Sequence, residues 1–288
     1  MATRTPSTTK TYLYLRVGLV ALALFLAASL VIEMAFGETE LLGSISAYYY
    51  TPVRSVFVGT LTAMGVCLIA LKGRDRPRED LMLNLAGMCA PAVAMVPTPL
   101  EGSAACGSAT SCVPHSYVAG VENNVGALLV VGAVGVLFAA RTVRRGRHEG
   151  ADLVALGASG AGLVGFAAWF FLARTSFLDY AHYGTAVPMF ALIVAVALVN
   201  AAKVEEFVAA GGTLTMGQAA TYKRAYRAIA YVMGVVIGGA LVLFLIEAAT
   251  GAELFAHWVF LVEALLLTAF TAFWILQTVQ YAADGAPN

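Results

Sequence analysis

The stretch VGLVALALFLAASLVIEMAF, from Val17 to Phe36, decides the class of fold, since Glu33 is its one charged residue. A helix of about 20 apolar residues crosses the hydrocarbon core of a bilayer. The run follows Lys10 and Arg16 and is longer than the apolar core of about 7–15 residues found in a cleaved signal peptide. We therefore interpret it as a first transmembrane helix that the protein keeps.

Apolar runs of this kind recur along all 288 residues. The chain is 60% hydrophobic and 12% charged, with a mean hydropathy of +0.81, whereas soluble domains carry about 25% charged residues. The sequence predicts an all-α fold, a single polytopic transmembrane bundle over residues 1–288. A net charge of zero gives no basic surface for nucleic acid. The eight predicted spans are residues 17–36, 53–71, 81–98, 121–140, 152–173, 181–202, 226–249 and 256–280.

Basic residues gather on one side of the predicted spans. With the N-terminus placed in the cytoplasm, the inner segments hold 15 of the 17 lysines and arginines, and only Arg54 and Arg174 fall outside. Because basic residues resist translocation, we expect a cell-membrane protein with both termini cytoplasmic. The inner segments are residues 1–16, 72–80, 141–151, 203–225 with Arg227 at a helix edge, and the C-terminal tail.

The outer face is predicted to be acidic, with eight acids against two bases. Such a face attracts cations or basic partners. The other interpretation is that acids accumulate wherever bases are excluded. The acids are Glu33, Glu38, Glu40, Glu101, Glu122, Asp179, Glu247 and Glu253.

Two cysteines in the longest outer loop, Cys106 and Cys112, bracket the segment GSATS. A translocated loop faces an oxidising compartment, and small residues between the cysteines permit a tight closure. We predict a disulfide between them. A metal site that recruits His115 is the alternative, but this spacing is unusual for zinc and lacks a fourth ligand.

Two histidines are predicted near the outer ends of spans. Asp179, His182 and Tyr183 share one helical face, so the carboxylate could orient the imidazole for proton transfer or help it hold a metal ion. His257 could approach them from the last span. A hydrolase usually needs three metal ligands or a nucleophile with its base, and the alternative is that Asp179 and His182 are ordinary interfacial polar residues.

Glu263 lies about one third of the way into the last span. A charge at this depth costs at least about 2.5 kcal/mol, so we expect it to face the bundle interior and find a donor, or to be protonated. Leu267, Phe270, Trp274 and Gln277 continue its helical stripe, which predicts an inward face with a polar residue at each end. A functional role and a structural hydrogen-bonding role are both open.

The loop between the first two spans reads GSISAYYYTPVR, from Gly43 to Arg54. We interpret its tyrosines as side chains of the headgroup zone and Arg54 as a counter-charge for an outer acid.

The stretch 43–73 resembles the conserved stretch of an uncharacterised bacterial multi-pass membrane family with a Ser-Ile-Ser-x-Tyr-Tyr loop. More distantly it resembles the DRAM and FGF-receptor-activating-protein group. The resemblance implies a membrane bundle of unassigned biochemistry. Tyr50 stands where this pattern has His, and Ser55 where it has Asp. The positions that match are Ser44, Ser46, Tyr48, Tyr49, Arg54, Phe57 and Gly59.

Together these features favour a non-enzymatic integral membrane protein without a cofactor, whose outer-facing cavity binds or passes a small molecule, lipid or ion. One alternative is an intramembrane lipid hydrolase with zinc at Asp179, His182 and His257; another is an accessory or scaffold subunit. In each case the lipid bilayer is the expected partner. The candidate ligand-binding residues are Glu33, Ser44, Ser46, Tyr48, Tyr49, Arg54, Asp179, His182 and Glu263.

Overall fold

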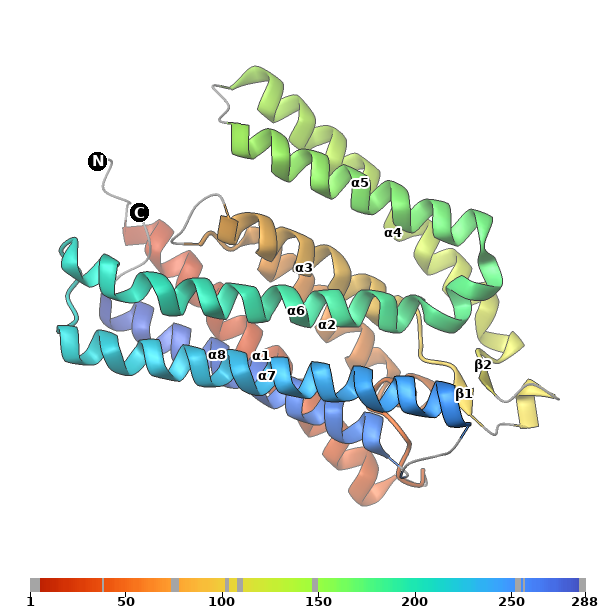
Figure 1. The fold of residues 1–288 in the computed structure, drawn as a ribbon. Coiled ribbons are helices and arrows are strands. Elements are labelled where there is room, and N and C mark those ends of the chain that lie inside the picture. The colour runs from red at the N-terminus through yellow and green to blue at the C-terminus, as the bar shows by residue number, and fades with distance from the viewer. Residues whose placement is uncertain are drawn as a thin grey trace.

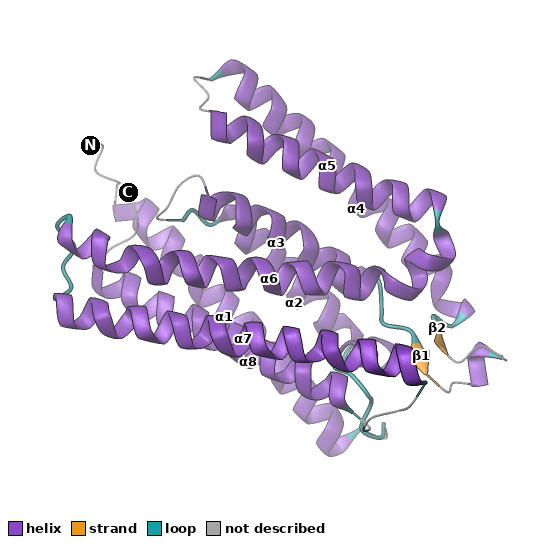
Figure 2. Cartoon of the chain, in the orientation of Figure 1, coloured by secondary structure: helices purple, strands orange, loops and turns teal. Residues whose placement is uncertain are grey.

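The computed structural model describes residues 6–37, 39–73, 78–101, 104–107, 111–146, 150–251, 255 and 257–284. The described chain is 86% helical, and the strands are confined to one two-residue ribbon (Figure 2). In chain order the elements are α1 (Pro6–Phe36), η1 (Ser46–Tyr50), α2 (Arg54–Ala70), α3 (Arg78–Met95), β1 (Leu100–Glu101), η2 (Ala104–Cys106), β2 (Ser111–Cys112), α4 (His115–Arg145), α5 (Gly150–Leu172), α6 (Arg174–Ala209), α7 (Met216–Thr250) and α8 (Trp258–Asp284).

Among the described residues, six of the eight α-helices, α1 and α4 to α8, are long and apolar enough to cross a membrane. α2 is apolar but has only 17 residues. α3 is less apolar because its first turn carries Arg78, Glu79 and Asp80. Both short helices lie among other helices of the bundle, so neither has to present an apolar surface to lipid all along its length.

Several helices begin before their predicted spans. α7 begins at Met216 and not at residue 226, because Thr215 caps its first turn and Gln218 completes a capping box. Apolar windows find the part of a helix that lipid can cover, whereas capping decides where the helix starts. In the same way α1 begins at Pro6, α4 at His115 and α6 at Arg174, against predicted starts at 17, 121 and 181.

Six helices form a closed ring around the main core. Each packs against the next in the order α1, α2, α3, α6, α7, α8, and α8 returns to α1. α1 begins and α8 ends at the same end of this ring, while η1, β1 and β2 lie at the other (Figure 1). We call these the α1-start end and the η1 end. Apolar side chains such as Leu26, Phe57 and Trp274 fill the core between them.

The α4–α5 hairpin stands beside the ring and meets it near β1 and β2, then diverges toward the α1-start end (Figure 1). Its contact with the ring is a small buried cluster that includes Val96, Val125, Phe170 and Phe177. Only 6% of the apolar window of α4, and the same share of that of α5, is buried. Both helices therefore offer most of their apolar surface to the surroundings.

α2 approaches α3 closely at two glycines, Gly65 and Gly87. A Cβ on Gly65 would lie 2.6 Å from the carbonyl oxygen of Gly87 and 2.8 Å from Pro91 Cδ. Absence of a side chain at Gly65 is therefore needed for this contact.

The predicted disulfide between Cys106 and Cys112 is present. It closes the loop beside the β1–β2 ribbon, in which Leu100 pairs with Cys112. His115 is the first residue of α4. With both thiols consumed in the disulfide, the alternative of a metal site at these cysteines is not realised.

Candidate functional site

The loop from Gly43 to Arg54 forms a buried plug at the η1 end of the ring. Tyr48 and Tyr49 of η1 are fully buried, so the interpretation of these two tyrosines as headgroup-zone side chains is wrong. The loop docks on the start of α8, where the carbonyl oxygen of Gly43 accepts from the Phe260 N–H at 2.8 Å. A first-turn N–H of a helix has no partner within the helix, and this one instead anchors the loop.

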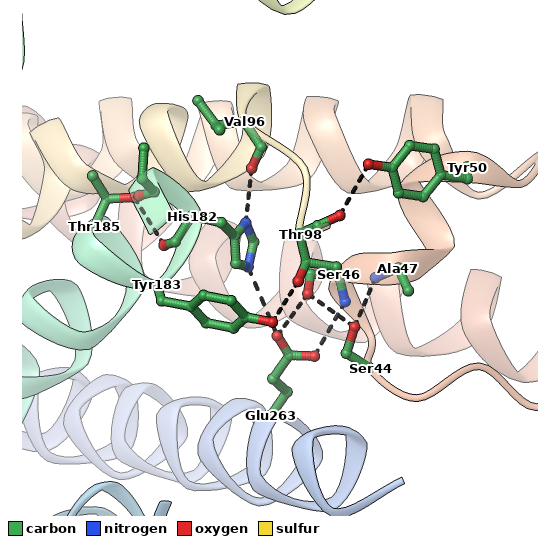
Figure 3. Close-up of polar contacts among 11 residues, drawn as sticks. Ser44, Ser46, Ala47, Tyr50, Val96, Thr98, His182, Tyr183, Thr185 and Glu263 are labelled. Atoms are coloured by element: carbon green, nitrogen blue, oxygen red, sulfur yellow. Dashed lines mark hydrogen bonds and ion pairs between the residues drawn. The ribbon is translucent and has the colours of Figure 1, made fainter. Parts of the chain in front are cut away.

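Glu263 of α8 points at this plug and accepts two hydrogen bonds from one residue (Figure 3). The Ser46 N–H donates to Oε2 at 3.1 Å and the Ser46 hydroxyl donates to Oε1 at 2.9 Å. The Ser44 hydroxyl oxygen in turn lies 3.2 Å from Ser46 Oγ and accepts from the Ala47 N–H at 3.0 Å. The Ser-Ile-Ser motif thus presents its donors to a carboxylate more than 200 residues away in the chain.

His182 of α6 faces the same carboxylate and approaches the oxygen that accepts from the Ser46 hydroxyl (Figure 3). Its Nε2 lies 3.8 Å from Glu263 Oε1, and its Nδ1 lies 2.8 Å from the carbonyl oxygen of Val96. A carbonyl oxygen only accepts, so Nδ1 must carry a proton. In the neutral imidazole Nε2 is then an unprotonated acceptor that faces a carboxylate oxygen.

The two members of the pair differ in their access to the surroundings. The Glu263 side chain is 20% exposed and that of His182 only 2% exposed. The carboxylate is therefore the member of the pair that the surroundings can reach.

A second layer of hydrogen bonds surrounds the pair. The Thr98 hydroxyl and the Tyr183 phenol oxygen lie 2.5 Å apart, and the Tyr50 phenol donates to the Thr98 carbonyl at 2.9 Å. Burial, reinforced by Tyr49 and Tyr117, raises the pKa of the Tyr50 phenol, so Tyr50 stays a donor. This layer ties η1 to the segment after α3.

Arg54 does not serve as a counter-charge. It lies in ion-pair distance of no carboxylate among the described residues; its guanidinium donates to the Tyr49 phenol oxygen at 2.9 Å. The guanidinium carbon lies 4.4 Å from the centre of the Tyr49 ring and 5.3 Å from that of Tyr117 on α4. The other outer base, Arg174, does pair with an acid, Glu122.

The remaining candidate residues lie apart from the Glu263–His182 pair. Glu33 accepts from the Thr39 hydroxyl at 2.7 Å. His257 Nδ1 lies 3.3 Å from the Leu42 carbonyl. Asp179 shows no hydrogen bond or ion pair to the described chain. Within those ranges no three His, Cys, Asp or Glu side chains converge as a metal site, so Asp179, His182 and His257 do not assemble the zinc centre.

Val96 and Thr98 are site residues that sequence reasoning missed. Pro97 and Pro99 follow the last turn of α3 and prevent the helix from continuing, so the carbonyls of Val96 and Thr98 have no helical N–H partner. Carbonyl oxygens left free in this way need other donors when buried. His182 and Tyr50 supply them, and the proline pair was the available signal.

Comparisons with protein-family models, curated proteins and solved structures found no match to this chain. What the protein does is therefore inferred from the contacts among its own residues.

Proposed function

We propose that this chain is a non-enzymatic integral membrane protein that binds an ion at the Glu263–His182 pair, and that the ion is a proton. The observation that carries the proposal is the 3.8 Å separation of His182 Nε2 and Glu263 Oε1, with Nδ1 held by the Val96 carbonyl. Two unprotonated acceptors at this distance repel each other. A proton on either one turns the repulsion into attraction.

The surroundings of the pair support a group that gains and loses its proton. Ser46 gives Glu263 two donors, which stabilise the charged carboxylate. Burial of His182 disfavours an isolated imidazolium. Both effects favour the proton-free pair, and they are opposed by the repulsion between the carboxylate oxygen and the imidazole lone pair, which one added proton relieves.

We further propose a place in the cell membrane, with both termini cytoplasmic and the η1 end outside. The bias of 15 in 17 basic residues supports this orientation. So does the Cys106–Cys112 disulfide at the η1 end, because disulfides persist outside the cytoplasm. The proposed relationship to the Ser-Ile-Ser-x-Tyr-Tyr membrane family is supported by the matching loop residues alone.

The test is a proton count in detergent solution. We expect wild-type protein to bind about one more proton than Glu263→Gln protein when the pH is lowered through the titration of the pair. Glu33→Gln also removes one half-buried acid that accepts from a threonine hydroxyl, so it should lower the count by one as well. The two acids are distinguished by adding His182→Gln, which should change the pH at which Glu263 binds its proton and leave that of Glu33 unchanged. A titration of Glu263→Gln protein that equals that of wild-type protein, while each is folded, would refute the proton site.

A further inference from the structure

The half of α4 nearer the α1-start end is covered by α5 and, within the described chain, by nothing else. Between residues 130 and 141 only every fourth side chain is partly covered, namely Gly132, Val136 and Ala140. A Cβ on Gly132 would lie 2.8 Å from Leu163 of α5, so this stripe faces α5. A helix with a second close neighbour would show a second covered stripe, and the hairpin diverges from the ring here (Figure 1). The rest of this half of α4 therefore faces the surroundings.

The face of α4 turned away from α5 is first apolar and then basic. Its large apolar side chains are each between 62% and 72% exposed, and three exposed arginines follow them at the end of the helix. Spacings of three and four residues place all of these side chains on one face. They are Val130, Val134, Leu137, Phe138, Arg141, Arg144 and Arg145. We call them the α4 face.

The three arginines of the α4 face make no hydrogen bond or ion pair with the described residues. The last turn of α4 does not use them, because the Gly146 N–H donates to the Thr142 carbonyl and the Thr142 hydroxyl donates to the Phe138 carbonyl. Lysines at the same end of the ring differ, since each pairs with an acid. These pairs are Lys72 with Asp80, Lys203 with Glu206 and Lys223 with Glu205. The three guanidiniums are thus available to a group outside the chain.

The apolar part of the α4 face is as tall as one leaflet of a bilayer. From Val130 to Arg141 the helix rises about 16 Å at 1.5 Å per residue, and half of a hydrocarbon core of about 30 Å is about 15 Å. A molecule complementary to this face is apolar over that length and anionic at its end. A phospholipid with an anionic headgroup has both properties, and its phosphate accepts charge-assisted hydrogen bonds from guanidinium groups.

We propose that the α4 face is a docking site for an anionic phospholipid of the leaflet at the α1-start end. An acyl chain lies along the apolar part, and the phosphate accepts from the three arginines. The planar guanidinium binds phosphate through two parallel hydrogen bonds, and basic residues near the membrane surface attract anionic lipid. In the orientation proposed above this is the cytoplasmic leaflet. The site is separate from the Glu263–His182 pair and does not depend on its proton.

The test places a fluorescent reporter on the α4 face. Phe138→Trp protein is reconstituted in phosphatidylcholine vesicles with a minor share of lipid whose acyl chains carry bromine, which quenches tryptophan on contact. Brominated phosphatidylglycerol should quench the added fluorescence with an affinity about fivefold higher than that of brominated phosphatidylcholine. Adding Arg141→Gln and Arg145→Gln should abolish this preference. A preference that survives these two substitutions, or none in Phe138→Trp protein, would overturn the inference.

The matched control lies on α7, in a region with the same local charge. Segments 141–152 and 203–227 each hold four lysines or arginines and two acids. Tyr231 is 64% exposed and follows Arg227 by one helical turn. Tyr231→Trp should report a preference below about twofold, and Arg224→Gln with Arg227→Gln should leave the preference at Phe138→Trp unchanged. Equal preferences at the two reporters would show general attraction of anionic lipid to basic segments and contradict a site on α4.

A free anion would use the arginines without the apolar part of the α4 face. Sodium phosphate should therefore displace brominated phosphatidylglycerol from Phe138→Trp protein no better than sodium chloride at equal ionic strength. Stronger displacement by phosphate would show a site for free phosphate and contradict a lipid site.

Discussion

Glu263 of α8 and His182 of α6 face each other across 3.8 Å, although α6 and α8 are not neighbours in the order of the ring. What places them is the backbone around them. The Val96 carbonyl orients the imidazole, and the Ser46 N–H and hydroxyl orient the carboxylate. Both supports come from outside the α-helices, at the η1 end of the ring, so the pair depends on how η1 and the segment after α3 are held.

The contact between α2 and α3 predicts that alanine substitutions at two glycines of α2 change the free energy of unfolding very differently. Gly65→Ala places a Cβ 2.6 Å from the Gly87 carbonyl oxygen, whereas Gly59→Ala meets nothing within 4 Å. We expect the first to lower the free energy of unfolding by about 1–3 kcal/mol. The second should raise it slightly, because alanine favours helix over glycine by about 1 kcal/mol. Unfolding titrations of both variants check this, and equal effects would contradict the close approach.

The disulfide predicts which cysteines react. Alkylation of denatured protein without reductant should modify Cys67 and Cys89 only, the two free cysteines. Reduction should then expose Cys106 and Cys112. Mass spectrometry gives the count directly, and four modified cysteines before reduction would contradict the pairing. Replacing both bonded cysteines by serine should cost about 2 kcal/mol, because the loop they close is short.

Arg54 is predicted to stabilise the fold and not to bind the ion. Arg54→Ala removes a hydrogen bond to Tyr49 and contacts with two aromatic rings, worth about 1–3 kcal/mol together. Arg54→Lys should rescue little of this, because an ammonium lacks the planar stacking surface. Thermal unfolding measures the loss. Proton binding at the Glu263–His182 pair should be unchanged in the folded fraction of both variants, and its loss would contradict this assignment.

Burial of the Tyr50 phenol predicts that the protein loses stability at alkaline pH. Burial raises the pKa of its phenol in the folded state above the ordinary value near 10. A raised folded-state pKa means that the contribution is fully present below about pH 10 and is lost as the pH rises further. Unfolding measured from pH 8 to 11 should show a shallower alkaline decline for Tyr50→Phe than for wild-type protein. Tyr180→Phe, at an exposed tyrosine, is the control and should match wild type.

The helical architecture followed from the sequence because the apolar runs are long and the charged residues sit between them. The inward stripe of α8 was also predicted and is confirmed, with Phe270, Trp274 and Gln277 buried. Periodicity carries this information, since residues three and four apart share a helix face. Helix starts were less well predicted, because polar first turns extend α1, α4, α6 and α7 beyond their apolar runs.

The partners of the site residues did not follow from the sequence. Ser46 and Glu263 are 217 positions apart. No local sequence pattern indicates that the loop after the first helix packs into the end of the ring beside the last helix. Arg54 drew attention because it breaks the charge bias, yet its contacts are tyrosine rings. The distribution of basic residues indicates on which side of a membrane a segment lies. Which side chain pairs with which depends on which helices become neighbours in the fold.

The central claim is that a proton is exchanged at Glu263, and infrared difference spectroscopy between acidic and alkaline pH tests it most directly. We predict a carboxylic-acid carbonyl band that forms on acidification. This band should be absent from Glu263→Gln protein and present in Glu33→Gln protein. In His182→Gln protein the band should form at a different pH. A band that survives Glu263→Gln unchanged would contradict the account.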